Sequence, residues 1–357
     1  MSPVSERVSS VDAFRGLTMA GMVIVNNPGT WDAIYWPLEH AEWHGWTPTD
    51  LIFPFFVFLV GVSMTLSHQT LDARPARIVE RGALIVCLGL TMAGFPFFNP
   101  HRWRVPGVLQ RIGLCYVAAA FVYRRSRNLA ALAAVVAVLL VGYWIVLTSF
   151  GDLTPDGNIG ARIDRALMGG HLWRPTWDPE GLLGTIPAIA TALLGVIAGL
   201  WLKAPITRER KVAVLVITGV ALVAAGEVWH AIFPINKQLW TSSYVLLTAG
   251  FSAMGLAVCM YTIEVLGARR WSHPFVVLGR NAITLFVVSG LLAKVLIMIP
   301  VPQADGSRAS LQGFMFEYGF AWIGPPKIAS LGYAVAFLAL MYWLCHVMYR
   351  RGVFLRA

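Results

Sequence analysis

Residues that could carry acid–base chemistry gather in one short stretch of the sequence. Two histidines, His40 and His44, stand there among the carboxylic acids Glu39, Glu42 and Asp50. Because imidazole gains and loses a proton near neutral pH, histidine is the usual general base of an enzyme. The spacing alone leaves all five residues as candidates for the base, and an unassisted histidine is more often passive than catalytic.

Two charged residues at the start of the first apolar run form a second candidate site. Asp12 and Arg15 are three positions apart, so a helix places them on one face. One interpretation is a local ion pair near the end of a helix that Ser10 caps. The other is that Arg15 faces an anionic ligand, because a cation just inside a membrane segment is costly without a partner.

Further polar residues stand near the ends of later apolar runs, among them Arg104, Arg111 and Asn281. Arginines at a proline-shaped turn, such as Arg104, are also typical of a membrane interface. Asn281 could be a helix cap or an interhelical hydrogen-bonding group, and Thr49 or Asp50 could cap the helix after the histidines. The sequence contains no P-loop, dinucleotide-binding glycine pattern, zinc-ligand pair or GxSxG elbow.

Membrane-spanning helices must position these residues. Of the 357 residues, 57% are hydrophobic and 13% are charged, and the mean hydropathy is +0.65. A soluble domain carries roughly 25% charged residues. We therefore expect an all-α integral membrane protein, a polytopic bundle of about ten transmembrane helices forming a single domain over residues 1–357. The ten apolar runs, each suited to a hydrocarbon core about 30 Å thick, are Val11–Asn27, Leu51–Ser67, Val79–Pro96, Gly107–Tyr123, Leu129–Ser149, Leu182–Leu202, Val212–Phe233, Ser242–Leu266, Pro274–Pro300 and Ile328–Tyr349.

The distribution of Lys and Arg predicts the orientation of these helices. With the N-terminus in the cytoplasm, the inside segments hold 16 of these residues and the outside segments hold 8. Since positive residues favour the cytoplasmic side, both termini are expected there. The same bias accounts for much of the net charge of +10, so no nucleic-acid partner is implied. The four cysteines fall inside apolar runs without a metal-binding or disulfide pattern, and we expect no metal.

Six segments of the sequence, taken in order, resemble one known family. They read SVDAFRGLTMAGMVIVNNPG, HAEWHGWTPTDLIFPFFVFLVG, RVPGVLQRIGLCY, DPEGLLGTIPAIATALLGVIAG, INKQLWTSSYV and PFVVLGRNAI. Together they resemble heparan-α-glucosaminide N-acetyltransferase and its bacterial relatives. The resemblance covers a signature region over about residues 7–290, and the closing helix is similar only in hydrophobicity.

The resemblance implies transfer of acetyl groups across a membrane. The lysosomal enzyme of this family takes them from cytosolic acetyl-CoA and places them on a terminal glucosamine amine on the lumenal side. Its essential histidine falls on His40, whereas the position of His44 is commonly asparagine. An active-site asparagine falls on Asn26. The DAFRG segment is similar to the start of the wider transmembrane acyltransferase class, in which the arginine, here Arg15, is associated with the acyl-CoA site.

These likenesses give a set of expected roles. His40 would be the general base or a transient acetyl carrier, Asn26 would donate to the oxyanion, and Asp50 could orient His40. Acetyl-CoA would be the co-substrate, docking from the cytoplasm with its phosphates near basic side chains. The expected acetyl-CoA-binding residues are Arg15, Asp12, Arg81 and Arg124, and the expected acceptor-binding residues are Trp43, Arg104, Arg111 and Asn281.

Two other functions stay open at this point. An amino-sugar permease or flippase built on the same scaffold would need the outer pocket but no acetyl donor. A non-catalytic membrane assembly subunit is the third interpretation. The expected location is the bacterial inner membrane, with the lipid bilayer and an amino-sugar or glycan acceptor as partners and a homodimer as a possible assembly. We also expect this chain to lack the lumenal N-terminal domain of the lysosomal enzyme.

Overall fold

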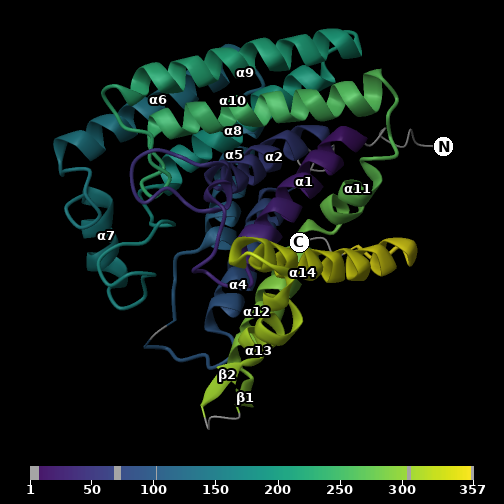
Figure 1. Ribbon diagram of the computed structural model, residues 1–357. Helices are drawn as coiled ribbons and strands as arrows, with labels where there is room; N and C mark the ends of the chain where they lie inside the picture. Colours follow the sequence, from purple (N-terminus) through teal and green to yellow (C-terminus); the bar gives the residue numbers. More distant parts are fainter. Residues whose placement is uncertain (1–7, 68–73, 102, 304–306, 355–357) are drawn as a thin grey trace. The chain divides into compact units, whose positions relative to one another are not determined.

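Helices form almost all of the regular structure, as the sequence predicts. The computed structural model describes residues 8–67, 74–101, 103–303 and 307–354 (Figure 1). Arg7, Arg102 and Arg356, which entered the charge count, lie outside the described residues. The thirteen described α-helices are α1 (Ser9–Asn26), α2 (Ile52–Leu66), α4 (Pro75–Gly94), α5 (Val108–Arg125), α6 (Leu129–Ser149), α7 (Ile159–Met168), α8 (Thr185–Lys203), α9 (Arg208–His230), α10 (Ser242–Met260), α11 (His273–Arg280), α12 (Ala282–Met298), α13 (Leu311–Gly319) and α14 (Pro326–Arg350).

A small hairpin departs from the all-α prediction. Strands β1 (Pro300–Pro302) and β2 (Arg308–Ser310) pair antiparallel, with Pro300 opposite Ser310. Proline at both ends of β1 removes backbone donors, which is tolerated at the edge of a two-stranded sheet. Short 3₁₀ segments lie at Trp36–Leu38 (η1), Pro48–Leu51 (η2) and Ala321–Ile323 (η4), and a π-helical turn at Tyr261–Val265 (η3) extends α10.

A helix lies on each of the ten apolar runs, but not all of these helices are suited to crossing a membrane. Within the described residues, six helices are long and apolar enough to span one. A seventh span results if α11 and α12 are counted together, although the chain bends by 79° between them. The run Pro274–Pro300 was expected as one span, and the structure divides it into α11 and α12 at Asn281. The count of ten stays a prediction.

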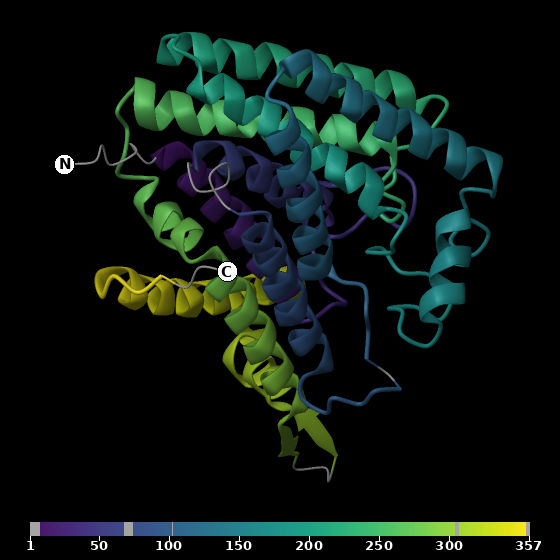
Figure 2. The same cartoon turned by 180° about the vertical axis from the view of Figure 1, so that it is seen from behind.

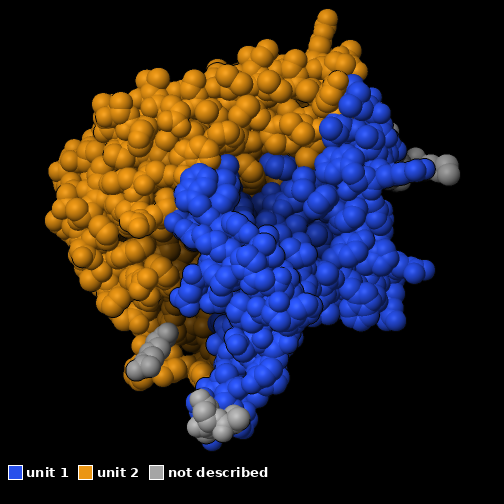
Figure 3. Space-filling view, in the orientation of Figure 1, with its two compact units in different colours: residues 1–40, 47–52, 262–356 blue, residues 41–46, 53–261, 357 orange. Residues whose placement is uncertain are grey.

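One compact unit comprises residues 1–40, 47–52 and 262–356 (Figure 3). Within this unit, which we call unit 1, α1 packs against α11, α12 and α14. The α1–α11 crossing is very close: a Cβ on Gly16 would lie 1.8 Å from the Phe275 carbonyl oxygen, and one on Gly279 1.9 Å from that of Asp12. Helix pairs in membranes commonly use small residues in this way, because the backbones can then touch.

The other compact unit, unit 2, comprises residues 41–46 and 53–261 together with residue 357. Here α9 packs along α10, α4 along α5, and α8 against α5 and α6 (Figures 1 and 2). Helices α2 and α8 approach closely, since a Cβ on Gly195 would lie 2.0 Å from the Phe58 carbonyl oxygen. Helix α7 is too short to span a membrane and carries Asp164 on its buried side.

Two expected helix caps are corrected by the structure. Helix α1 begins at Ser9 after Val8, without a side-chain cap, and the Ser10 hydroxyl instead donates to Glu264 Oε1 at 2.7 Å. The η2 segment that leads into α2 is capped by Thr47, not by Thr49. The Thr49 hydroxyl instead donates to the Pro37 carbonyl oxygen at 3.0 Å.

Candidate active site

The first candidate base is paired with a buried carboxylate. His40 Nδ1 lies 2.6 Å from Asp50 Oδ1 in unit 1. The His40 side chain is 44% exposed, whereas that of Asp50 is 1% exposed. A carboxylate held on Nδ1 fixes the tautomer and orientation of an imidazole, so that proton transfer to a substrate would use Nε2. This arrangement can perform general-base or nucleophilic chemistry.

Local backbone structure holds Asp50 in this position. Thr47 and Asp50 form a reciprocal capping box at the start of η2. In it, the Thr47 backbone N–H donates to Asp50 Oδ2 at 3.0 Å, and the Thr47 hydroxyl reaches the Glu39 carbonyl oxygen next to His40. The Asp50 oxygen Oδ2 therefore accepts hydrogen bonds at the start of η2, and the other oxygen, Oδ1, contacts His40.

Asn26, the expected oxyanion donor, is the last residue of α1 and is exposed. Its neighbour Asn27 is buried, and the Asn27 amide donates back to the Val23 carbonyl oxygen at 2.7 Å. The side-chain partner described for His40 is Asp50, and no observation tests a contact with Asn26. The catalytic role of Asn26 therefore stays a prediction.

The predicted pairing at the start of α1 is present. Arg15 Nη1 donates to Asp12 Oδ1 at 2.8 Å and approaches the Gly279 carbonyl oxygen at 3.4 Å. The Arg15 side chain is 18% exposed and that of Asp12 is 8% exposed. The pair shows that protein groups hold the Arg15 side chain in place. This is compatible with a structural role and with a ligand-binding role of Arg15. A role in acetyl-CoA binding stays a prediction.

The two further arginines expected at acetyl-CoA belong to unit 2. Arg81 on α4 is exposed, and its guanidinium lies over the Tyr116 ring of α5 at 5.1 Å. Arg124 is half-buried in the last turn of α5, where a cation also interacts favourably with the helix dipole. Neither observation tests whether Arg81 or Arg124 binds the phosphates of acetyl-CoA.

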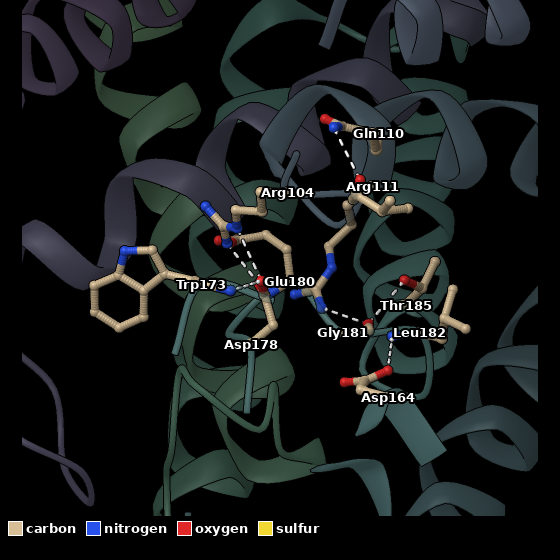
Figure 4. Close-up of polar contacts among 11 residues, drawn as sticks. Arg104, Gln110, Arg111, Asp164, Trp173, Asp178, Glu180, Gly181, Leu182 and Thr185 are labelled. Carbon is tan, nitrogen blue, oxygen red and sulfur yellow. Dashed lines mark hydrogen bonds and ion pairs between the residues drawn. The ribbon is translucent and has the colours of Figure 1, made fainter. Parts of the chain in front are cut away.

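Arg104 forms an ion-pair cluster instead of standing alone at an interface. Its Nε donates to Asp178 Oδ2 at 2.8 Å and its Nη2 to Asp178 Oδ1 at 2.6 Å, and Nη2 also pairs with Glu180 (Figure 4). Burial lowers the pKa of Arg104, but the hydrogen bonds and charges of Asp178 and Glu180 outweigh it and raise that pKa. A planar guanidinium matched to a carboxylate in this way is a strong structural clamp.

Arg111 is the most deeply buried cation of this region. Its residue exposure is 2%, and its Nη2 donates to the Gly181 carbonyl oxygen at 2.9 Å (Figure 4). Its guanidinium lies 5.0 Å from the Trp240 ring centre. Nε and Nη1 are buried without a hydrogen-bond partner among the described residues. A buried charge with unused donors is costly, and it is the kind of group that a ligand satisfies.

Arg111 lines a pocket of unit 2 that also contains Trp43. The pocket has a cavity volume of about 20 Å³ and lies between α5, α7 and the segments before α8 and α10. The Trp43 indole N–H donates to the Leu153 carbonyl oxygen at 2.7 Å, and its ring meets Trp177 edge-on at 5.2 Å. Two residues expected at the acceptor, Trp43 and Arg111, are thus brought together here.

Asn281 is not among the residues that line this pocket; it belongs to unit 1 and stands at the break between α11 and α12. It is 1% exposed, and its Nδ2 donates to the Val277 carbonyl oxygen at 3.0 Å. The buried Oδ1 has no hydrogen-bond partner among the described residues. Its expected role at the acceptor is untested, and its observed role is at the helix break.

His44 has surroundings unlike those of His40. Its Nδ1 lies 3.3 Å from Asn236 Nδ2 in unit 2, which is an accepting position for a neutral ring. Burial, and then the charge of His230, lower the pKa of His44 below its ordinary value of 6.5. The adjacent Gly45 N–H donates to the Ile235 carbonyl oxygen at 2.8 Å, which ties this segment to the start of α10.

The pocket residues that the sequence interpretation missed include Asp164, Trp177 and Gln238. Asp164 is 2% exposed, its Oδ1 accepts from the Leu182 N–H at 3.0 Å, and burial raises its pKa. The available signal was the amphipathic pattern of residues 159–168, where Asp164 falls on the apolar side. Gln238 gave no signal, because its position depends on the turn before α10.

Fold and site together define a helical protein whose described residues include six or seven segments suited to crossing a membrane, with a histidine–aspartate pair at the start of one of them. Residues 7–213 match the family model described as heparan-alpha-glucosaminide N-acetyltransferase, catalytic. The human heparan-alpha-glucosaminide N-acetyltransferase is 32% identical over 80% of this chain, and the mouse protein is 31% identical over 79%. The chain belongs to this family. It spans about half of each relative, 53% of their length.

Proposed function

We propose that the chain is a membrane acetyltransferase that moves an acetyl group from cytoplasmic acetyl-CoA to the amine of an amino sugar on the periplasmic side. The observation that carries this proposal is the 2.6 Å contact between His40 Nδ1 and the buried Asp50 carboxylate. Membership of an N-acetyltransferase family supports the same chemistry. The bacterial inner membrane, with its lipid bilayer, is the proposed location, and a homodimer is a proposed assembly.

In the proposed step, the acceptor nitrogen attacks the thioester carbonyl carbon. A C–N bond forms, the C–S bond breaks, and the CoA thiolate leaves. His40 takes the proton of the amine and passes it to the thiolate, so that the products are an amide and free CoA. Asp50 stabilises the imidazolium that forms in between. In the two-step version, His40 carries the acetyl group and then yields it to the amine.

Binding of the two substrates is assigned to separate groups. Arg15, held by Asp12, with Arg81 and Arg124, would contact the phosphates of acetyl-CoA. Asn26 would donate to the oxyanion that develops on the thioester oxygen. The acceptor would use Trp43, Arg104, Arg111 and Asn281, of which Trp43 and Arg111 line one pocket.

A thiol-release assay tests the proposal directly. Purified protein with acetyl-CoA and glucosamine should release free CoA over many turnovers only when the amine is present. His40→Ala should abolish this release while acetyl-CoA still binds, and His44→Asn should keep most of it. Sustained wild-type turnover in His40→Ala would contradict the mechanism.

The amino-sugar permease or flippase stays the second candidate. The observation in its favour is the 79° bend between α11 and α12, because discontinuous membrane helices often line transport sites. Uptake of glucosamine or N-acetylglucosamine into protein-containing vesicles without any acetyl-CoA would favour this function. Amine-dependent CoA release without such uptake would favour the acetyltransferase.

A further inference from the structure

The segment that follows α1 is held by a serine of the closing helix, α14. The Ser330 hydroxyl accepts from the Thr30 backbone N–H at 3.1 Å and donates to the Thr30 carbonyl oxygen at 3.0 Å. The Ser330 carbonyl oxygen accepts from the Gly29 N–H at 3.2 Å. Ser330 is 2% exposed, so these bonds are sheltered from water. Two consecutive residues are thus bound to α14 by three hydrogen bonds.

Helix α13 holds the same segment at its first residue. Gln312 Nε2 donates to the Pro28 carbonyl oxygen at 3.1 Å. One turn further along α13, the Phe316 ring packs against Gly29 so closely that a Cβ on Gly29 would lie 2.4 Å from it. Glycine permits such an approach because it has no side chain. We call the contacts of Gln312 and Ser330 with residues 28–30 the anchor.

The anchor begins two residues after Asn26, which is the last residue of α1. Helix ends fray unless further contacts hold them. Between Asn26 and the anchor stands Asn27, whose side-chain amide donates to the Val23 carbonyl oxygen at 2.7 Å. Two residues of chain reach at most about 7 Å. The placement of Asn26 therefore depends directly on how firmly residues 28–30 are held.

An oxyanion donor needs this kind of support. Groups that stabilise a transition state must be held within about 0.5 Å of the productive position. A displacement of about 1 Å can lower the rate roughly a hundredfold. Helices α13 and α14 lie beyond residues 7–213, which match the family model, so the support for the end of α1 comes from a different part of the chain.

We propose that Ser330 and Gln312 are positioning residues for acetyl transfer. By anchoring residues 28–30 they hold the end of α1, and with it Asn26, where the Asn26 amide can donate to the oxyanion on the thioester carbon. The closing part of the chain thereby completes the site. The catalytic part of this inference rests on the proposed function, whereas the anchor itself does not.

Steady-state kinetics of CoA release give the first test. Ser330→Ala should lower kcat about ten- to a hundredfold, with both KM values within about twofold, because the proposed substrate-binding residues are not part of the anchor. Gln312→Glu keeps the shape of the side chain but gives a carboxylate, which cannot donate to the Pro28 carbonyl, so kcat should fall about three- to tenfold. The matched control is Ser289→Ala. Ser289 is 3% exposed and bonds locally to the Phe286 carbonyl oxygen within α12, so its kcat should stay within about twofold of wild type.

A double-mutant cycle asks whether Ser330 acts through Asn26. Asn26→Ala should lower kcat about 10²- to 10³-fold, as expected for an oxyanion donor. Adding Ser330→Ala to that variant should lower kcat by no more than about a further twofold, because there is no longer an amide to position. If Ser330→Ala costs the same factor with and without Asn26, Ser330 merely supports the fold, and the positioning role is overturned.

Hydrogen exchange tests the anchor without any turnover. In Ser330→Ala, the amide of Thr30 should exchange about three- to tenfold faster than in wild type, because its hydrogen bond is lost, and Ser289→Ala should leave that rate unchanged. Unchanged exchange in Ser330→Ala would overturn the anchor even if acetyl transfer is observed. Faster exchange together with a wild-type protein that shows no amine-dependent CoA release would support the anchor and refute the proposed function, and with it the catalytic part of this inference.

Discussion

Replacing Asp50 by asparagine is expected to remove most acetyl-transfer activity while leaving the protein folded. The amide oxygen of asparagine can still accept from the Thr47 N–H, so the capping interaction survives. The amide nitrogen then faces His40 Nδ1 at the position that Asp50 Oδ1 occupies at 2.6 Å. Because two donors cannot face each other, Nδ1 must accept and Nε2 carries the proton, which is the wrong tautomer for a base.

The size of the effect follows from this change of tautomer. Loss of a general base lowers turnover about 10²- to 10⁴-fold, which corresponds to roughly 3–5.5 kcal/mol of transition-state stabilisation. The free energy of unfolding should change by less than about 0.5 kcal/mol, because asparagine and aspartate serve similarly at helix starts. Asp50→Asn is thus expected to lose most of its turnover and to keep its free energy of unfolding.

Thr47→Ala supplies the opposite control. It removes the hydroxyl of the capping box but leaves the Asp50 carboxylate beside His40, so the free energy of unfolding should fall by about 0.5–2 kcal/mol with little change in kcat. The assays are CoA thiol release at saturating acetyl-CoA and glucosamine, and thermal unfolding in the same detergent. A kcat in Asp50→Asn within about threefold of wild type would refute the orienting role of Asp50.

Four further outcomes are expected. A cysteine at Thr30, in a background without native cysteines, should react with an impermeant reagent from the periplasm, and one at Ser126 only after permeabilisation; the reverse labelling would contradict the orientation. Arg15→Ala should weaken acetyl-CoA binding about ten- to a hundredfold in a folded protein, and an unchanged Kd would leave Arg15 a purely structural partner. The pKa of His44 is lowered in the folded protein, so below about pH 6.5 the unfolded state binds more protons and the free energy of unfolding decreases as the pH is lowered. Melting curves between pH 7 and pH 5 should show a smaller decrease in His44→Asn than in wild type. Arg104→Ala should lower the free energy of unfolding by about 3–5 kcal/mol, since it leaves a buried carboxylate unpaired, and an unchanged melting temperature would contradict the clamp.

The parts of the site that depend on short-range spacing could be predicted from the sequence. The three-residue separation of Asp12 and Arg15 on a helix is enough to predict their ion pair. Asp50 was expected as a helix cap or as a partner of His40; Thr47 is the cap, and Asp50 contacts His40 from the third position of the capping box. The sequence also carried a signal for Thr47 as the cap, because Pro48 stands at the first helical position and Asp50 completes a capping box with Thr47.

The parts that depend on distant segments could not be predicted. Arg104 finds Asp178 across 74 positions of sequence, and nothing local to either residue identifies the other. The break at Asn281 is hidden by an apolar run that continues on both sides of it, and only the polar pair of Arg280 and Asn281 within the run hinted at a bend. Hydrophobicity indicates how long an apolar segment is, not whether it is straight.

His40 and Asp50 are close together in the sequence, and this affects when their contact can form during synthesis of the protein. The contacts described above for this pair lie within residues 37–50. Loop-closure entropy for so few residues is small, so the pair can assemble as soon as the second helix has left the ribosome, before most of the chain exists. Residues 37–50 would then form a unit that can be exchanged between relatives. Chimeric proteins made in this way should retain the His40–Asp50 pair and take their acceptor preference from the rest of the chain.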